Sequence, residues 1–121
     1  MASFPVLQRG KYPAGADLSA KYGFAVKLSS GQAVLAAAGE SSIGILQNKP
    51  TSGQSAEVML FGISPVIAGA GFSEGANLAS DVNGKMIAAT AGAKIVGKAL
   101  ATASGADVMV EALILPVGEQ P

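Results

Sequence analysis

The chain of 121 residues contains no cysteine and no histidine. Without cysteine there can be no disulfide framework, no thiol nucleophile and no thiolate metal site. Without histidine the chain lacks the commonest general base and the commonest zinc ligand. We therefore expect no catalytic residues, no bound metal and no cofactor, and a function other than that of an enzyme.

Charged and aromatic side chains are also scarce. Charged residues make up 13% of the chain, with eight basic residues balancing eight acidic ones, and aromatic residues make up 5%. Nucleic-acid-binding surfaces need basic residues interleaved with aromatic ones, so we expect no nucleic-acid partner. A weakly charged surface suits a protein packed against other protein, although a weakly charged soluble domain has the same composition.

Long apolar runs are missing as well. No run approaches the roughly 20 residues that cross a bilayer, and the first 15 residues lack the apolar stretch of a secretory signal. We expect no membrane partner, and synthesis in a cytoplasm. Half of the residues are hydrophobic, but many of these are alanine. Because a core of small side chains buries little area per residue, the composition favours an oligomer.

The first twenty residues differ from the rest, and we expect an extended N-terminal arm over residues 1–20 followed by one β-rich domain over residues 21–121. Prolines and glycines interrupt any regular period in the arm: Pro5, Gly10, Pro13 and Gly15. Apolar side chains lie between them: Phe4, Val6, Leu7 and Tyr12. The arm is either a disordered terminus or a segment whose apolar side chains dock on a neighbour.

After residue 21, short apolar runs alternate with turn signals every 8 to 12 residues, which predicts an all-β fold, a small β-barrel or β-sandwich. The predicted strands are residues 22–28, 32–38, 42–48, 56–63 continuing to 69 after a bend at Pro65, 76–80, 86–90, 94–102 and 107–116. Asn83-Gly84 is a strong hairpin signal. The alanine-rich runs leave one short helix as an alternative, for example over residues 76–81.

The stretch NKPTSGQSAEV at residues 48–58 is either a ligand loop or a turn. A phosphate-binding loop would need Gly-Lys-Ser or Gly-Lys-Thr before a helix, whereas here a strand-like run follows. IGILQNKPTSGQSAEVMLFGISP and IVGKALATASGADVMVEALILP both place a Ser-Gly turn between apolar stretches. This repetition predicts two β-hairpins, so we interpret residues 48–55 as a turn that reverses the chain.

Two groups of charged residues offer weaker functional alternatives. Glu57 and Asp107 follow the two Ser-Gly turns at equivalent places, which would allow a paired-carboxylate site, although solvated strand starts explain them as well. Lys85, Lys94 and Lys98 would make a small basic patch or a solvated face. A small β-barrel enzyme or ligand carrier therefore stays as an alternative function.

The run from about Ala25 to Pro116 resembles the capsid decoration, or cement, proteins of tailed bacteriophages. Its front half, AVKLSSGQAVLAAAGESSIGILQNKPTSGQSAEVMLFGISPVIAG, has the pattern Ile-Gly-Ile followed by Gly-x-x-Ala-x-Val. Its back half, GANLASDVNGKMIAATAGAKIVGKALATASGADVMVEALIL, has Asp-x-x-Gly, then Val-Gly-x-Ala-Leu and Gly-x-x-Val-x-Val.

The resemblance implies a structural virion protein, made in the host cytoplasm, that binds the outer surface of the expanded phage head. Related proteins commonly form trimers that bridge neighbouring subunits of the major capsid protein, and arms in such proteins often contact the capsid. We therefore predict a homotrimer whose capsid contact includes Phe4, Pro5, Val6, Leu7 and Tyr12. A low-copy attachment module of the phage head or tail is a further alternative.

Overall fold

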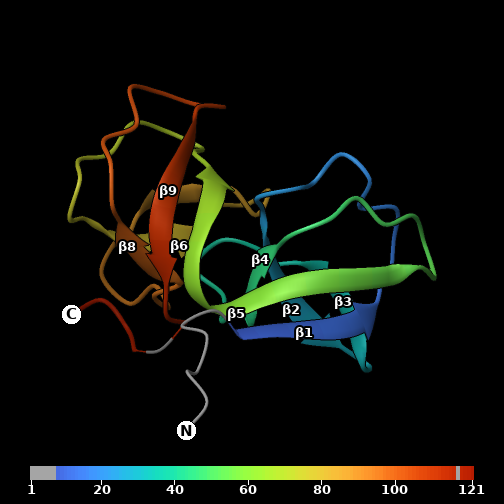
Figure 1. Ribbon diagram of the computed structural model, residues 1–121. Helices are drawn as coiled ribbons and strands as arrows, with labels where there is room; N and C mark the ends of the chain where they lie inside the picture. Colours follow the sequence, from blue (N-terminus) through green and yellow to red (C-terminus); the bar gives the residue numbers. More distant parts are fainter. Residues whose placement is uncertain (1–7, 117) are drawn as a thin grey trace, which may run out of the picture.

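The computed structural model describes residues 8–116 and 118–121, and these residues form nine β-strands and no helix (Figure 1). The strands are β1 (Gln8–Pro13), β2 (Ala25–Ser29), β3 (Gln32–Leu35), β4 (Gly44–Leu46), β5 (Ser55–Ile67), β6 (Asn77–Ser80), β7 (Met86–Ala88), β8 (Gly97–Ala99) and β9 (Met109–Ile114). The described part of the chain thus has no helix that could cross a membrane. The predicted all-β fold is confirmed.

The strands form a single antiparallel sheet that curls into a half-barrel. The order along the sheet is β3-β2-β4-β5-β9-β8-β6-β7, and β1 pairs with β5 beside this path. The thirteen-residue β5 runs through both halves of the molecule, with β1 to β4 around its first part and β6 to β9 around its second part (Figure 1). The curl brings Met86 of β7 back to Ala68, which follows β5, in an isolated parallel bridge.

Two clusters of buried side chains lie on opposite faces of the central strands. The larger cluster lies within the curl of β5 to β9 and includes Met59, Leu78 and Ile114, whereas the smaller one includes Leu18 and Leu46. Neighbouring residues of β2, β4 and β5 point alternately into the two clusters. A strand with both faces buried needs a continuous apolar run, which explains why these segments lack the alternating polar pattern of a half-exposed sheet.

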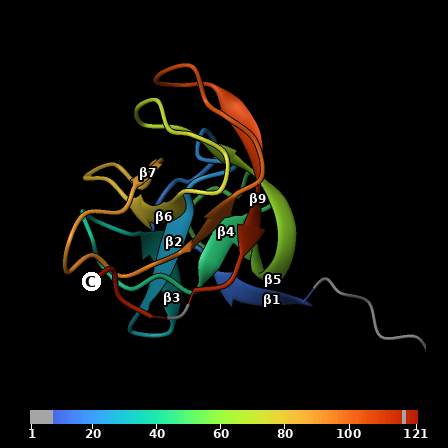
Figure 2. The same cartoon turned by 90° about the vertical axis from the view of Figure 1, so that its left-hand side faces the viewer.

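β5 changes direction near its middle. Its pairing with β1 shifts register between Met59 and Phe61, so that Leu60 is an extra residue, and Gly62 has a φ of 133° that favours glycine. Pro65, by contrast, lies inside the strand opposite Glu111. The bend predicted at Pro65 is therefore wrong. The bulge and Gly62 bend the strand instead, and Figure 2 shows the resulting curve of β5 from the side.

The predicted turns are present, and the alternative of a short helix is wrong for the described residues. β6 and β7 form the Asn83-Gly84 hairpin, in which the side chain of Asp81 accepts hydrogen bonds from the N–H groups of Asn83 and Lys85 at 2.8 and 2.9 Å. Residues 76–81, where a helix was an alternative, contain β6. Ala79 within it is buried, because small side chains let the curled strands approach each other.

Candidate functional site

The chain enters the sheet at a point where two strands meet on one edge of β5. β1 starts with Gln8 opposite Phe61, and β9 ends with Ile114 opposite the next residue, Gly62. Of the predicted capsid-contact residues, Phe4, Pro5, Val6 and Leu7 lie outside the described residues. Any contact that these four residues make therefore starts from the junction of β1, β5 and β9.

Tyr12 is the one predicted contact residue that the structure describes, and it belongs to β1. It pairs with Ala56 of β5, and its half-buried ring packs against the smaller core cluster. Further along, Ala14 and Leu18 are buried in the same cluster. Residues 8–18 therefore contribute to the sheet and its core. A shallow hollow of about 240 Å³ lies beside the exposed part of Tyr12, lined also by Lys11, Pro13, Gly53 and Ser55.

The stretch at residues 48–55 is the turn between β4 and β5, as the sequence predicted. The side chain of Asn48 donates a hydrogen bond to the carbonyl of Ser55 at 2.9 Å and accepts one from the N–H of Glu57 at 3.0 Å. The N–H of Gly53, which has a φ of 84°, donates to the carbonyl of Ala14. Because these groups satisfy one another's hydrogen bonds, the turn is a structural element. It lies against residues 14–18, the segment that leads from β1 towards β2.

The structure does not bring the two suggested carboxylates together. Glu57 lies opposite Lys11 of β1 near the start of β5. Asp107 lies beyond the other end of that strand, where its N–H donates to the carbonyl of Ala68, and its carboxylate binds Lys85 at 2.5 Å. The paired-carboxylate hypothesis is therefore wrong. Among the described residues, no group of acidic side chains is placed to hold a metal ion.

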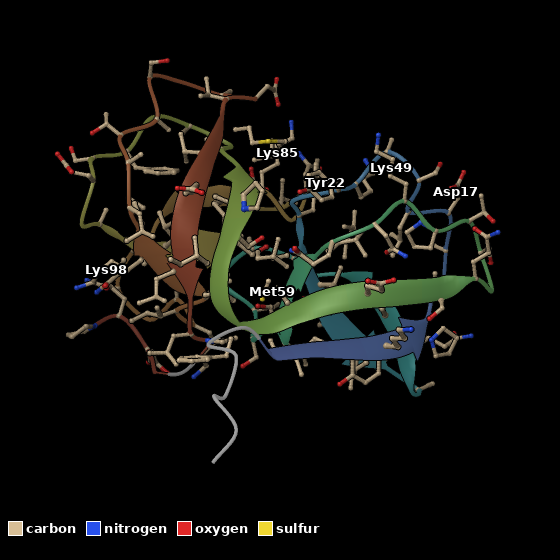
Figure 3. All side chains as sticks on the ribbon, in the orientation of Figure 1. Asp17, Tyr22, Lys49, Met59, Lys85 and Lys98 are labelled. Carbon is tan, nitrogen blue, oxygen red and sulfur yellow. The ribbon has the colours of Figure 1, made fainter. Side chains whose placement is uncertain are left out.

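The three lysines of the suggested basic patch are also separated. Lys85 binds Asp107, and Lys94 binds Glu119 of the C-terminal segment. Figure 3 shows Lys85 and Lys98 far apart, with Lys98 at the outer side of the half formed by β6 to β9. The hydrogen bond between the Lys85 ammonium and Asp107 raises the pKa of Lys85. Lys85 and Lys94 are thus held in ion pairs, Lys98 lies apart from Lys85, and the three lysines give no concentrated positive field.

Two carboxylates, those of half-buried Glu40 and exposed Asp17, stabilise turns. The Lys27 ammonium, at 2.7 Å, and the N–H of Ala37 lower the pKa of Glu40, which ties β2 to the segment after β3. The hydroxyl and the N–H of Ser19 lower the pKa of Asp17 in the segment before β2. In both cases hydrogen bonds to the charged form are the cause. These pKa shifts are explained by local structure and do not indicate a reaction.

The largest feature that sequence reasoning missed is an apolar outer surface on β5, β8 and β9. Of the seven large hydrophobic side chains that are exposed in the described residues, five lie on these strands or directly after them: Phe61, Ile63, Leu100, Met109 and Leu115. In the sequence, the runs 56–63 and 107–116 look like any buried strand. Nothing in the local sequence pattern reveals which face of such a strand is exposed to solvent.

The comparison with family models decides the class of the protein. The model of the phage cement proteins matches residues 14–114, which include every strand except β1. The chain belongs to the phage cement protein family. The predicted resemblance is thereby confirmed, and the family places the chain among the structural proteins of phage particles. Members of such families are typically not enzymes. The matched residues start after the segment that contains the predicted arm contacts.

A solved structure shares the fold of this cement protein. It is the N base of head fiber gp8.5 of bacteriophage phi29, with a TM-score of 0.74 and 16% sequence identity over 95% of this chain and 99% of that one. At this identity the likeness establishes the common fold and nothing more. No curated protein matches the chain in sequence.

Proposed function

We propose that this cement protein is a capsid decoration protein that binds the outer surface of the expanded phage head and bridges neighbouring subunits of the major capsid protein, as a homotrimer. The observation that carries the proposal is the family match, which spans the fold from Ala14 to Ile114. The fold shared with the base of a phage head fiber supports the location on the head.

The proposed stabilisation follows from differential binding. Packaged DNA pushes the capsid subunits apart, and a protein that bridges them adds contacts that must break first. A ligand that binds only the expanded lattice shifts the equilibrium toward that lattice by its difference in affinity. In a trimer, three linked attachments raise the effective affinity well above that of one attachment.

Within this function, we assign part of the capsid contact to the first residues of the chain. Phe4, Pro5, Val6 and Leu7 are apolar and precede the junction at Gln8, so they can reach protein outside the fold while β1 stays anchored on β5. The exposed part of Tyr12 on β1 is the described residue that we include in this contact. Strand addition to an exposed sheet edge of the capsid protein is the proposed mode of contact.

The copy number of the chain in purified particles tests the decoration role. A ratio near one copy per major capsid subunit is expected for a protein spread over the whole lattice. Heads without the protein should lose their DNA at a lower temperature than complete heads. Adding the purified protein back should raise the temperature of DNA loss to that of complete heads. If purified particles contain no copies of the chain, the proposed role in the virion is ruled out.

The arm contact requires its own experiment. A chain without residues 2–7 keeps β1 and the core, whereas a longer deletion would remove buried Ala14 and unfold the smaller cluster. We expect this short deletion to leave the unfolding temperature nearly unchanged and to weaken binding to expanded heads at least tenfold. A variant with Ser3→Ala serves as the control. Undiminished binding by the deleted chain would rule out the arm contact.

The shared fold also supports a second candidate function, that of a low-copy attachment module. The matched phi29 structure is the base of a head fiber. A fiber base would occur at fewer sites than a lattice-wide cement protein. The same copy-number measurement separates the two, because a handful of copies per particle would favour the attachment module.

A further inference from the structure

The outward side chains of β5 and β9, together with the residues directly after β8 and β9, form an apolar surface. We name it the outer patch: Phe61, Ile63, Leu100, Met109, Leu113 and Leu115. The two most exposed members are Met109 and Ile63, with 51% and 50% of their surfaces accessible. Leu113 is half-buried. β9 lies between β5 and β8, so the patch covers the outside of one half of the molecule (Figure 1).

The strand register places these side chains in four adjacent rows. Ile63, Leu113 and Lys98 form one row, and Pro65 lies opposite Glu111 in the next. The last row has Ile67 and Met109. At the other end, Phe61 and Leu115 are the residues next to the paired Gly62 and Ile114. Leu100 donates its N–H to the carbonyl of Glu111, which puts it in the row of Glu111. Lys98 and Glu111 are thus the only charged residues in the four rows.

This composition is unusual for the open face of a sheet. Most intervening residues of the same strands point inward and are buried, including Ser64, Val66 and Ala112. An antiparallel sheet with one face on the core normally carries polar residues on the other. Here both faces are apolar, and a contiguous exposed apolar patch marks an interaction surface.

The two charges indicate what kind of partner fits the patch. Lys98 and Glu111 make no ion pair with any described residue, although each is exposed. A partner must therefore offer an anion and a cation at matching positions around an apolar centre. A second copy of the chain offers this arrangement, because its own outer patch carries one charge of each sign around Leu113.

The shape of the patch is complementary to itself as well. A hollow of about 360 Å³ lies at one side, lined by Asn77, Ile95, Gly97, Lys98, Leu113 and Leu115. The hollow offers space for a protruding apolar side chain. Phe61, Ile63 and Met109 protrude from the other side of the patch, where they could fill the hollow of a facing copy.

We propose that the outer patch is the contact surface between copies of this chain, with Lys98 of one copy paired with Glu111 of the next. The proposal rests on the self-association included in the proposed function, but it does not depend on capsid binding. Around a symmetry axis, the Lys98 side of each copy faces the Glu111 side of a neighbouring copy. The same ion pair therefore repeats at each contact.

The patch is small enough that the association should be reversible. Four rows on three strands cover roughly 300 Å², given about 3.3 Å per residue along a strand and about 4.8 Å between strands. A standard interface buries about 800 Å² on each partner, so the patch would be its apolar centre and polar neighbours its rim. Sedimentation equilibrium from about 10 μM to about 1 mM chain is therefore the appropriate measurement.

Charge reversal then tests the pairing directly. We expect Lys98→Glu and Glu111→Lys each to weaken self-association about tenfold, because each variant brings like charges together across the contact. An equimolar mixture of the two variants should associate again, since the two acidic side chains of one variant then face the two basic side chains of the other. Lys49→Glu and Glu74→Lys are matched controls, with the same changes in net charge at exposed positions outside the patch. Ile63→Ser, which changes the apolar centre, should weaken association at least tenfold.

Three results would overturn the proposal. The first is a wild-type chain that stays monomeric throughout the concentration range. The second is a mixture of the two charge variants that associates no better than either variant alone. The third is Ile63→Ser chain that self-associates normally but binds expanded heads poorly, which would assign the patch to the capsid. Binding of the wild-type chain to heads is measured separately. A wild-type chain that self-associates but does not bind heads contradicts the decoration role and leaves this proposal standing.

Discussion

At the scale of single residues, Met59 connects the two halves of the fold. It is buried, belongs to the larger cluster, and lies next to Val58 of the smaller one (Figure 3). We expect Met59→Ala to lower the free energy of unfolding by about 2–5 kcal/mol, because the truncation leaves a cavity at the bend of β5. Met59→Leu conserves volume and should cost less than about 1.5 kcal/mol. Urea unfolding measures both; equal losses would contradict the cavity explanation.

The ion pair of Glu40 predicts a pH dependence of stability. Hydrogen bonds from Lys27 and Ala37 lower the pKa of Glu40 from its ordinary value of 4.5. The folded state therefore binds this proton less readily than the unfolded state, and the stabilisation is present above pH 4.5 and lost as the pH falls through the folded pKa. Thermal unfolding should show wild type more stable than Glu40→Gln near neutral pH, with the difference vanishing in acid.

Glu74→Gln is the control for this titration, because Glu74 is an exposed loop residue without an ion pair among the described residues. The difference in stability between wild type and Glu74→Gln should change little over the same pH range. A constant difference between wild type and Glu40→Gln from neutral to acid pH would show that the carboxylate's charge contributes nothing.

At the scale of elements, the hairpins differ in how tightly their glycines are enclosed. Gly53 and Gly84 have nearly the same backbone, with φ values of 84° and 85°. A methyl group on Gly53 would meet nothing within 4 Å, whereas one on Gly84 would lie 3.1 Å from the carbonyl oxygen of Ala25. Gly53→Ala should therefore cost about 1 kcal/mol from the strained φ alone.

Gly84→Ala should cost about 1–2 kcal/mol more than Gly53→Ala, because the β6–β7 hairpin must also move away from β2. The N–H of Ala25 donates to the carbonyl of Gly84 at 2.7 Å, so this movement strains a hydrogen bond between the two halves of the sheet. Chemical unfolding of the two variants gives the comparison. Equal costs would mean that the hairpin is free to shift.

The elements also show how far the sequence alone could lead. Asn83-Gly84 and the two Ser-Gly turns encode their hairpins locally, so the strands β4 to β9 could be predicted. The pairing of β1 with β5 could not, because proline and glycine at residues 10–15 indicate an extended segment without naming its partner. Likewise, the apolar runs of β5 and β9 predict strands but not the uncovered outer face. Both missed features depend on contacts between distant parts of the chain.

The bend of β5 has the same origin. Pro65 was the local signal for a bend, yet the pairing of β5 with β9 continues through it without a shift of register. The bend comes from the extra residue at Leu60 and from Gly62, whose backbone other residues avoid. A bulge is defined by its partner strand, and the partner here is β1. It therefore has no signature in the sequence of β5 itself.

At the scale of the whole molecule, the shared strand β5 should make the two clusters unfold together. Leu46 is fully buried in the smaller cluster and Leu78 in the larger one, while β2, β4 and β5 supply side chains to both. Gly44 keeps β4 close to β5, since a methyl group there would overlap the carbonyl oxygen of Met59. Neither cluster can lose these strands without exposing the other, so unfolding should be a single cooperative transition.

Leu46→Ala and Leu78→Ala test this coupling, because each leaves a cavity in one cluster and should cost about 2–5 kcal/mol. In both variants, amide signals from β3 and from β8 should disappear at one common urea concentration, lowered from that of wild type. Signals from β3 that disappear first in Leu46→Ala, while β8 stays folded, would show two independent units. In that case the bridging strands would transmit no stability between the two halves of the fold.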